Sequence, residues 1–257
     1  MGTKGIVGVV SNGTLKASFS MLDSHPCRLG VRFAGFLADA MASGGVPRLR
    51  GLADAMAPVP WNDDAYQPMP EAMVRSLALA GLVHDGRIEV EGYSPFLCMA
   101  GFVSAHGLPG MLRAGWYIDA GGYAANPECE WGWIADLDEG VLEVHRGRAV
   151  DFHGEGRFAE AFRAGPMVWY GEEMEDPPIR LIARIPFGRL REAIDGFTAL
   201  DIFADVAAGR WSMPMAKELA EDLEEDWDAQ LEKLDAIGWM WTAESRARIG
   251  EARGIAA

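Results

Sequence analysis

The chain opens with a pattern of β-branched residues that predicts a β-hairpin over residues 3–20. Asn12-Gly13 lies at its centre, and a type I′ turn favours this dipeptide because both central residues need a positive φ. The runs on either side are rich in Val and poor in charge, which is typical of strands that are half-buried or buried. We therefore expect the chain to begin inside its own sheet, with no leader segment ahead of the first strand.

A second alternating pattern covers residues 129–147 and predicts another hairpin. Residues 131–135 and 141–145 are expected to pair as antiparallel strands around a turn at 138–140, because the alternation and the turn composition agree. A further strand is expected over 179–185.

Apolar residues at helical spacing predict helices that pack on this sheet. One helix is expected over 28–42 and another over 71–82. The glycines of 95–126 favour irregular packing with close backbone approaches. From residue 197 onward the pattern is helical, and 215–237 carries an apolar stripe with acidic residues on its other faces. That acidic surface is either a solvated face or a docking surface for a basic partner.

Together these elements predict an α+β fold. An antiparallel sheet is built from the N-terminal and central hairpins, and the predicted helices pack on it. We expect an α+β domain over 1–195 and a helical C-terminal region over 196–257 packed on that domain. A chain of 257 residues is long enough to bury a full hydrophobic core.

The net charge of −15 narrows the classes of partner. Affinity for nucleic acid comes largely from neutralising phosphates, so this charge disfavours direct nucleic-acid binding. No apolar run approaches the roughly 20 residues of a membrane span, and no export signal is seen, so we expect no membrane association and a cytoplasmic location. The three cysteines are widely spaced and odd in number, which is typical of reduced thiols. The sequence does not determine the oligomeric state.

Candidate binding residues gather around the aromatic side chains in the middle of the chain. Trp116, Trp131 and Trp133, together with Asp119 and Asp136, are expected to line a ligand pocket. The alternative is that the aromatic side chains are split between the two faces of the sheet, with only one buried. The five histidines form no HxxxH or HExxH pair, and there is no Walker loop or GxGxxG turn, so we expect no metal and no cofactor.

Two stretches of the chain carry a family pattern. Residues 1–5 and 23–30 read Met-Gly-Thr-Lys-Gly and Asp-Ser-His-Pro-Cys-Arg-Leu-Gly, and 129–147 begins Cys-Glu-Trp-Gly-Trp-Ile-Ala-Asp-Leu-Asp. The chain thereby resembles a group of phage, bacterial and fungal proteins without an established activity. Those proteins begin Met-(Gly/Cys)-Thr-Arg-Gly, continue with Asp-Ser-Tyr-Pro-Ser-Gly-Leu-Gly, and carry a Cys-Glu-(Trp/Tyr)-Ala-Tyr-Val-Ile-Asp-Leu-Asp hairpin. The resemblance implies an accessory protein of phage type. The chain departs from the group's pattern at Lys4, which replaces Arg, at His25, which replaces Tyr, and at Cys27-Arg28, which replaces Ser-Gly.

The start of the chain is also similar in layout to the N-terminal-nucleophile (Ntn) hydrolases. In those enzymes the first residue after processing supplies both the nucleophile and an α-amino base. The likeness implies an Ntn-like fold, and the candidate catalytic residues are Thr3, Asp23 and His25. Gly2, however, has no nucleophile, and it leaves Thr3 without a free amine beside its hydroxyl. The alternative is that Thr3 is an ordinary strand residue and that Asp23 caps a helix.

Two functions from different classes follow. The first is a non-catalytic, acidic binding or accessory protein, phage-encoded and acting on a host protein. The second is an amide hydrolase or transferase of the N-terminal-nucleophile type, degenerate in this chain. The lack of a nucleophile at position 2 favours the first. The sequence decides neither the identity of a partner nor whether enzymatic activity remains.

The mass of the purified protein tests the second function. We expect removal of Met1 at most, which leaves Gly2 as the first residue. Intact-mass spectrometry reads this directly. Loss of both Met1 and Gly2 would expose Thr3 with a free amine and would favour the hydrolase.

Overall fold

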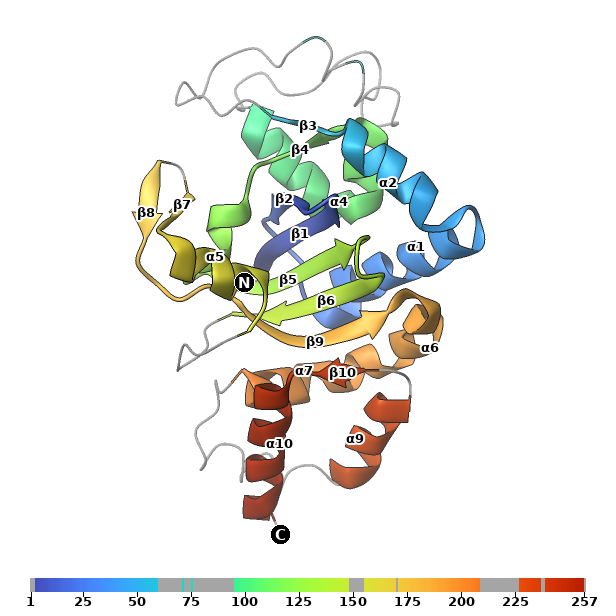
Figure 1. Ribbon diagram of the computed structural model, residues 1–257, viewed down its shortest axis with the longest axis vertical. Helices are drawn as coiled ribbons and strands as arrows, with labels where there is room; N and C mark the ends of the chain where they lie inside the picture. The colour runs from blue at the N-terminus through green and yellow to red at the C-terminus, as the bar shows by residue number, and fades with distance from the viewer. Residues whose placement is uncertain are drawn as a thin grey trace.

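The centre of the molecule is a six-stranded mixed sheet with the strand order β10-β9-β6-β5-β1-β2 (Figure 1). The α+β class predicted from the sequence is confirmed. The computed structural model describes residues 3–59, 71, 75, 95–147, 155–169, 171–208, 227–236 and 239–256.

The first hairpin is formed as predicted. Strands β1 (Lys4–Ser11) and β2 (Thr14–Ser20) pair antiparallel. Asn12 and Gly13 between them have φ values of 53° and 72°, the two positive values that a type I′ turn requires.

The second hairpin is also confirmed. Strands β5 (Cys129–Asp136) and β6 (Val141–Arg146) pair antiparallel, with Trp133 opposite Val144. The predicted strand that follows is β9 (Arg180–Pro186), which pairs antiparallel with β6.

The two hairpins join through a parallel pairing of β1 with β5, so the expectation of a wholly antiparallel sheet is wrong. A parallel pair needs a long crossover connection between its strands. The chain between β1 and β5 returns through β2 and then passes through several helices before it re-enters the sheet. Local patterns along the sequence do not indicate this pairing.

The sheet is covered on both faces (Figure 1). One face carries Trp131 and Trp133 and packs against α1 (Val31–Ala42), α4 (Pro95–Ala114) and α7 (Phe197–Ala207). A short π-helical turn, η1 (Pro26–Gly30), leads into α1, which confirms the predicted helix over 28–42. The opposite face is covered by α5 (Arg157–Ala164), whose Phe158 contacts the ring of His145.

Further elements complete the described fold. They are α2 (Gly45–Ala55), β3 (Ala57–Pro58), β4 (Trp116–Tyr117), η2 (Gly121–Ala125), β7 (Met167–Trp169), β8 (Glu172–Met174), η3 (Phe187–Arg189), α6 (Leu190–Ala193), η4 (Ile194–Gly196), α9 (Trp227–Ala236), β10 (Met240–Trp241) and α10 (Ala243–Ala256).

The glycine-rich stretch is more regular than its composition indicates. Residues 95–114 are helical, with one break at Gly107, where φ is 59° and ψ is −153°. A side chain at this φ would be strained, so glycine allows the chain to continue into a second helical segment. A close backbone approach of the expected kind occurs at Gly122, where an added Cβ would overlap the carbonyl oxygen of Val168.

The C-terminal residues 196–257 contribute an edge strand as well as helices. β10 pairs antiparallel with β9, and α7, α9 and α10 accompany it. Of the predicted acidic helix over 215–237, residues 227–236 are helical, and the others lie outside the described residues. Most of the predicted helix over 71–82 also lies outside them. Within the described part of the chain, no helix combines the length and apolar character needed to cross a membrane.

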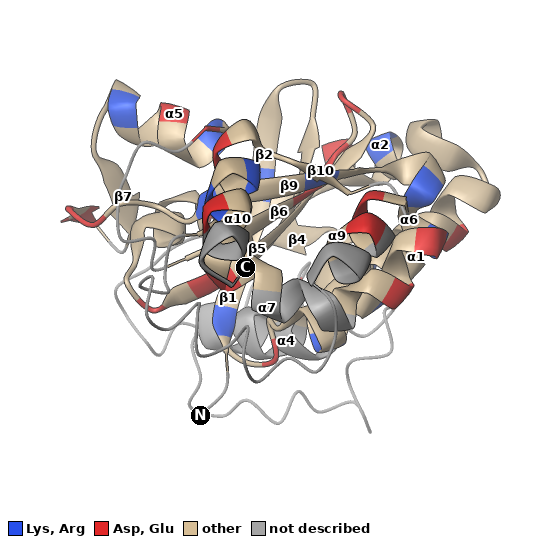
Figure 2. Ribbon diagram, turned by 90° about the horizontal axis from the view of Figure 1, so that it is seen from below, with Lys and Arg blue, Asp and Glu red and all other residues tan. Residues whose placement is uncertain are grey.

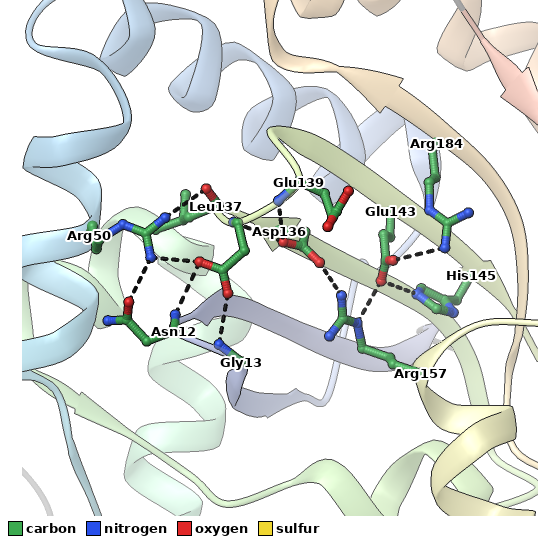
Figure 3. A network of polar contacts seen from close by, with 11 residues as sticks. Asn12, Gly13, Arg50, Asp136, Leu137, Glu139, Glu143, His145, Arg157 and Arg184 are labelled. Atoms are coloured by element: carbon green, nitrogen blue, oxygen red, sulfur yellow. Dashed lines mark hydrogen bonds and ion pairs between the residues drawn. The ribbon is translucent and has the colours of Figure 1, made fainter.

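The turns of the two hairpins are tied together at one end of the sheet (Figure 3). The Asp138 carboxylate accepts hydrogen bonds from the backbone N–H groups of Asn12, at 3.1 Å, and Gly13, at 2.7 Å. Arg50 of α2 donates to the same carboxylate at 2.6 Å and to the carbonyl oxygen of Leu137 at 3.0 Å. One carboxylate therefore connects both turns and a helix.

Helix α2 is fixed to the first hairpin by two further contacts. Lys16 Nζ donates to three carbonyl oxygens at the carboxyl end of α2, those of Ala53, Asp54 and Met56, at 2.9, 3.0 and 2.9 Å. A cation at this end of a helix also interacts favourably with the helix dipole. The Asp54 carboxylate accepts a hydrogen bond from Ser11 Oγ at 2.6 Å. The position of α2 is thus set by β1 and β2.

The stability that Asp138 supplies should depend on pH. The backbone N–H of Gly13 and the guanidinium of Arg50 hold the pKa of Asp138 below its usual range. A lowered pKa in the folded state gives stability that is present above the unfolded pKa of about 4 and is lost as the pH falls through the folded pKa.

We predict that Asp138→Asn lowers the free energy of unfolding by about 1 kcal/mol at pH 7, because a neutral acceptor makes weaker hydrogen bonds than a charged one. The difference from the unmodified protein should shrink below pH 4, as measured by urea denaturation. Glu139→Gln is the matched control in the same turn and should change little at either pH. A difference that stays constant down to pH 2.5 would contradict the assigned role of the charge.

Candidate functional site

The predicted catalytic residues lie near the start of η1, and the described contacts of Thr3 and Asp23 are made by their backbone carbonyl oxygens. The carbonyl oxygen of Thr3 accepts a hydrogen bond from the N–H of Ser24 at 3.1 Å. Asp23 is exposed, has a φ of 57°, and accepts a hydrogen bond from the N–H of Leu29 through its carbonyl oxygen at 3.2 Å. The start of η1 has no side-chain cap, so the capping alternative for the Asp23 carboxylate is not seen either.

The imidazole of His25 has a different neighbour from those expected. Its Nδ1 lies 3.1 Å from the sulfur of Cys27, which is exposed, and its ring meets Trp131 edge-on at a centroid distance of 6.3 Å. Burial raises the pKa of Asp205 on α7, and the charges of Arg146 and, less strongly, His25 oppose that rise. His25 therefore contacts the thiol of Cys27 and acts electrostatically on Asp205 of α7.

The five predicted binding residues do not share one cavity. Trp131 and Trp133 are buried and stacked, with centroids 5.6 Å apart and planes 11° apart. Both point to the face of the sheet that packs on α7, whereas Asp136 lies on the opposite face, where it contacts α5. Trp116 is half-buried in β4, and Asp119 is exposed. The two stacked rings are core residues, and the binding role of the set stays a prediction.

Asp136 belongs to a buried ion cluster on that opposite face (Figure 3). Arg157, the first residue of α5, pairs with Asp136 and donates from Nε to Glu143 at 2.7 Å. The same carboxylate oxygen of Glu143, Oε2, lies 3.2 Å from Nε2 of His145. The second carboxylate oxygen of Glu143, Oε1, lies 3.5 Å from Arg184. Two strands, β6 and β9, and the helix α5 therefore meet at the Glu143 carboxylate, and Arg157 links a third strand, β5, to them through Asp136.

The cluster sets the charge states of its members. Burial alone would raise the pKa of Glu143, but hydrogen bonds and charge from His145 and Arg157 hold it below its usual range. Burial lowers the pKa of His145, and the hydrogen bond and charge of Glu143 oppose that effect. The side chains of Glu143 and His145 are only 3% and 1% exposed. They are out of reach of a substrate, and the cluster is structural.

An open groove lies between α1, α2 and α4. Its volume is about 460 Å³. Leu49 and Leu112 are buried at its base, Phe36 is half-buried, and Leu52 is 39% exposed at its margin. Its charged lining residues are Asp39, Arg48 and Arg113, all of which are exposed. The groove therefore presents an apolar base with charged side chains at its rim.

Sequence reasoning missed this groove for a physical reason. Phe36 fits the apolar stripe of α1, so its spacing predicts a core residue and not the lining of a groove. The spacing of Leu49, Leu52 and Ala53 does indicate an apolar stripe on α2. That the stripes of three helices border one space depends on their tertiary arrangement, which no local pattern indicates.

The described residues contain no group of three or more His, Cys, Asp and Glu side chains placed to hold a metal ion.

The contacts of Arg157 in the ion cluster should contribute to the stability of the folded protein. Removing one member of a buried ion pair costs about 3–5 kcal/mol, since its partners stay buried and charged. Because the Arg157 side chain is 21% exposed, we predict that Arg157→Gln lowers the free energy of unfolding by about 3 kcal/mol. Urea denaturation measures the change. Arg163→Gln, at an exposed position of the same helix, should cost less than about 0.5 kcal/mol. Equal effects at the two positions would show that the cluster does not fix α5.

The chain was compared with protein-family models, with curated proteins and with solved structures. None of the three comparisons found a match. The functional argument accordingly rests on the residues and geometry given above.

Proposed function

We propose that the chain is a non-catalytic binding protein that holds an amphipathic helix of a partner protein in the groove between α1, α2 and α4. The observation that carries this proposal is the open apolar groove with exposed Leu52 at its margin. Amphipathic helices dock into such grooves by burying apolar residues spaced three and four apart.

The distribution of polar groups favours a helix over a small molecule. Small-ligand sites generally place a few converging polar groups inside an apolar pocket, where they orient the ligand. Here Asp39, Arg48 and Arg113 are exposed, and the base is made of Leu49, Leu112 and half-buried Phe36. A helix satisfies its own backbone hydrogen bonds, so it needs only an apolar surface below it and charged groups beside it.

The groove is supported by a fixed wall. Lys16 of β2 donates hydrogen bonds to the carboxyl end of α2. From α2, Arg50 contacts Asp138 in the second hairpin turn, and Asp54 accepts a hydrogen bond from Ser11 at the end of β1. A wall that is held in place before binding lowers the entropy lost on association.

The finer parts of the proposal come from the sequence. The resemblance of the chain start and of residues 129–147 to phage-type proteins supports a phage accessory protein that acts on a host protein. The net charge of −15 supports a protein partner over nucleic acid, and a cytoplasmic site of action is part of the same proposal.

The N-terminal-nucleophile hydrolase stays an alternative prediction. It would need Thr3 with a free amine, and the described contact of Thr3 is made by its carbonyl oxygen with Ser24. The groove, in contrast, lies among the helices and requires no chemistry at Thr3.

A synthetic helix tests the proposal. The probe is a fluorescent amphipathic helix of about 18 residues, long enough to be stable when stapled, with leucines on one stripe and glutamines elsewhere. We predict saturable binding that Leu52→Gln weakens about fivefold, because full burial of a leucine contributes about 1.5–3 kcal/mol, Leu52 is 39% exposed in the free protein, and 1.4 kcal/mol is a factor of about ten. Fluorescence anisotropy gives both dissociation constants.

The matched control is Leu22→Gln, the same substitution at a leucine that is 54% exposed outside the groove. It should leave the dissociation constant unchanged. Equal weakening by both variants, or no saturable binding, would sink the proposal. Binding of dodecanol but not of the helix would instead identify a small-molecule site.

A further inference from the structure

The rim of the groove carries more positive than negative charge, on a chain whose net charge is −15. Arg48 comes from α2, Arg113 from α4 and Asp39 from α1. The single carboxylate among these three is already engaged, since Asp39 accepts a hydrogen bond from Arg191 at 2.5 Å. The rim of the groove is therefore locally positive, although the chain as a whole is negatively charged.

The two arginines of the rim, Arg48 and Arg113, have N–H groups that can donate hydrogen bonds to a bound partner. Arg48 donates to the carbonyl oxygen of Ser43 at 3.5 Å, and Arg113 donates from Nε to that of Pro109 at 3.2 Å. Neither guanidinium pairs with a carboxylate in the described part of the chain. Arg50, two residues from Arg48, is in contrast committed to Asp138. An arginine presents five N–H donors, so Arg48 and Arg113 can each still receive a carboxylate.

Two guanidinium groups, those of Arg113 and Arg32, act on the imidazole of His106. Burial lowers the pKa of His106 on α4, and the charges of Arg113 and Arg32 lower it further. Arg32 on α1 and Arg113 on α4 therefore both act on one site between their helices. In Figure 2, α2 shows basic positions on the side of the molecule where α1 also lies.

We infer that the occupant of the groove is an acidic amphipathic helix, with leucine-like residues on the base and Asp or Glu side chains that pair with Arg48 and Arg113. This inference rests on the proposed function, and it adds the charge of the partner. A basic helix would be attracted by the chain as a whole but would meet two guanidinium groups at the groove itself. Electrostatic complementarity at the contact selects between such partners, whereas charge at a distance acts mainly on the association rate.

Three stapled helices of equal length test the inference. They share one leucine stripe and carry Glu, Gln or Lys at the other positions. We expect the Glu helix to bind most tightly to the intact protein and the Lys helix least tightly. Raising the salt concentration from 0.05 to 0.5 M should reduce the difference, because exposed charges are screened over a few ångströms at high salt.

The double variant Arg48→Gln/Arg113→Gln should weaken binding of the Glu helix about fivefold, since each exposed pair contributes little. It should leave the Gln helix unchanged and strengthen binding of the Lys helix. The matched control is Arg163→Gln/Arg246→Gln, which changes the net charge equally at exposed arginines that do not line the groove. Its effect on all three helices should be less than twofold.

The outcomes separate the two proposals. Tightest binding of the Lys helix, or equal binding of all three, would overturn the acidic occupant and leave helix binding intact. Absence of binding by every helix would overturn the proposed function as well. If the chain forms dimers that Leu52→Gln dissociates, the occupant is a second copy of the chain, and the inference is wrong.

Discussion

The parallel pairing of β1 with β5 is the constraint on which the rest of the structure depends. Because these two strands run in the same direction, the turns that follow them lie at the same end of the sheet. Asp138 in one turn can then accept hydrogen bonds from Asn12 and Gly13 in the other. These N–H groups point outward from a type I′ turn, and Arg50 supplies the balancing positive charge. An antiparallel arrangement would place the two turns at opposite ends and would separate Asp138 from Asn12 and Gly13.

The two faces of the sheet are stabilised by different interactions. On the face toward α7, Trp131 and Trp133 stack on one another, and the second ring stacks on Phe197. On the face toward α5, the ion cluster around Glu143 replaces part of that apolar contact. A buried ion cluster is weak evidence of added stability, because desolvation offsets much of the attraction. Its more direct consequence is geometric: Arg157 can meet both Asp136 and Glu143 in only one placement of α5.

The sequence predicted the parts of the fold that depend on neighbouring residues. Both hairpins were predicted because Asn12-Gly13 specifies a turn type and because residues 131–145 alternate with a period of two. The parallel pairing, the meeting of Arg157 with Glu143 and the groove were not predicted, since each joins segments that are distant in the chain. Asp136 shows the same limit. The hairpin that contains it was correctly predicted, although β5 runs one residue beyond the predicted strand over 131–135, and its partner Arg157 lies 21 residues farther along the chain in α5.

Net charge and local charge act on a partner at different distances. With a Debye length of about 8 Å at physiological salt, a charged residue that lies farther than this from the groove is largely screened from a helix seated in it. The groups within that distance decide which helix is retained, and at the rim these are Arg48, Arg113 and a paired Asp39. The acidity of the chain therefore does not require a basic partner. The net negative charge of the chain disfavours nonspecific association with acidic molecules. An acidic helix is therefore bound only where its leucines also contact Leu49 and Leu52.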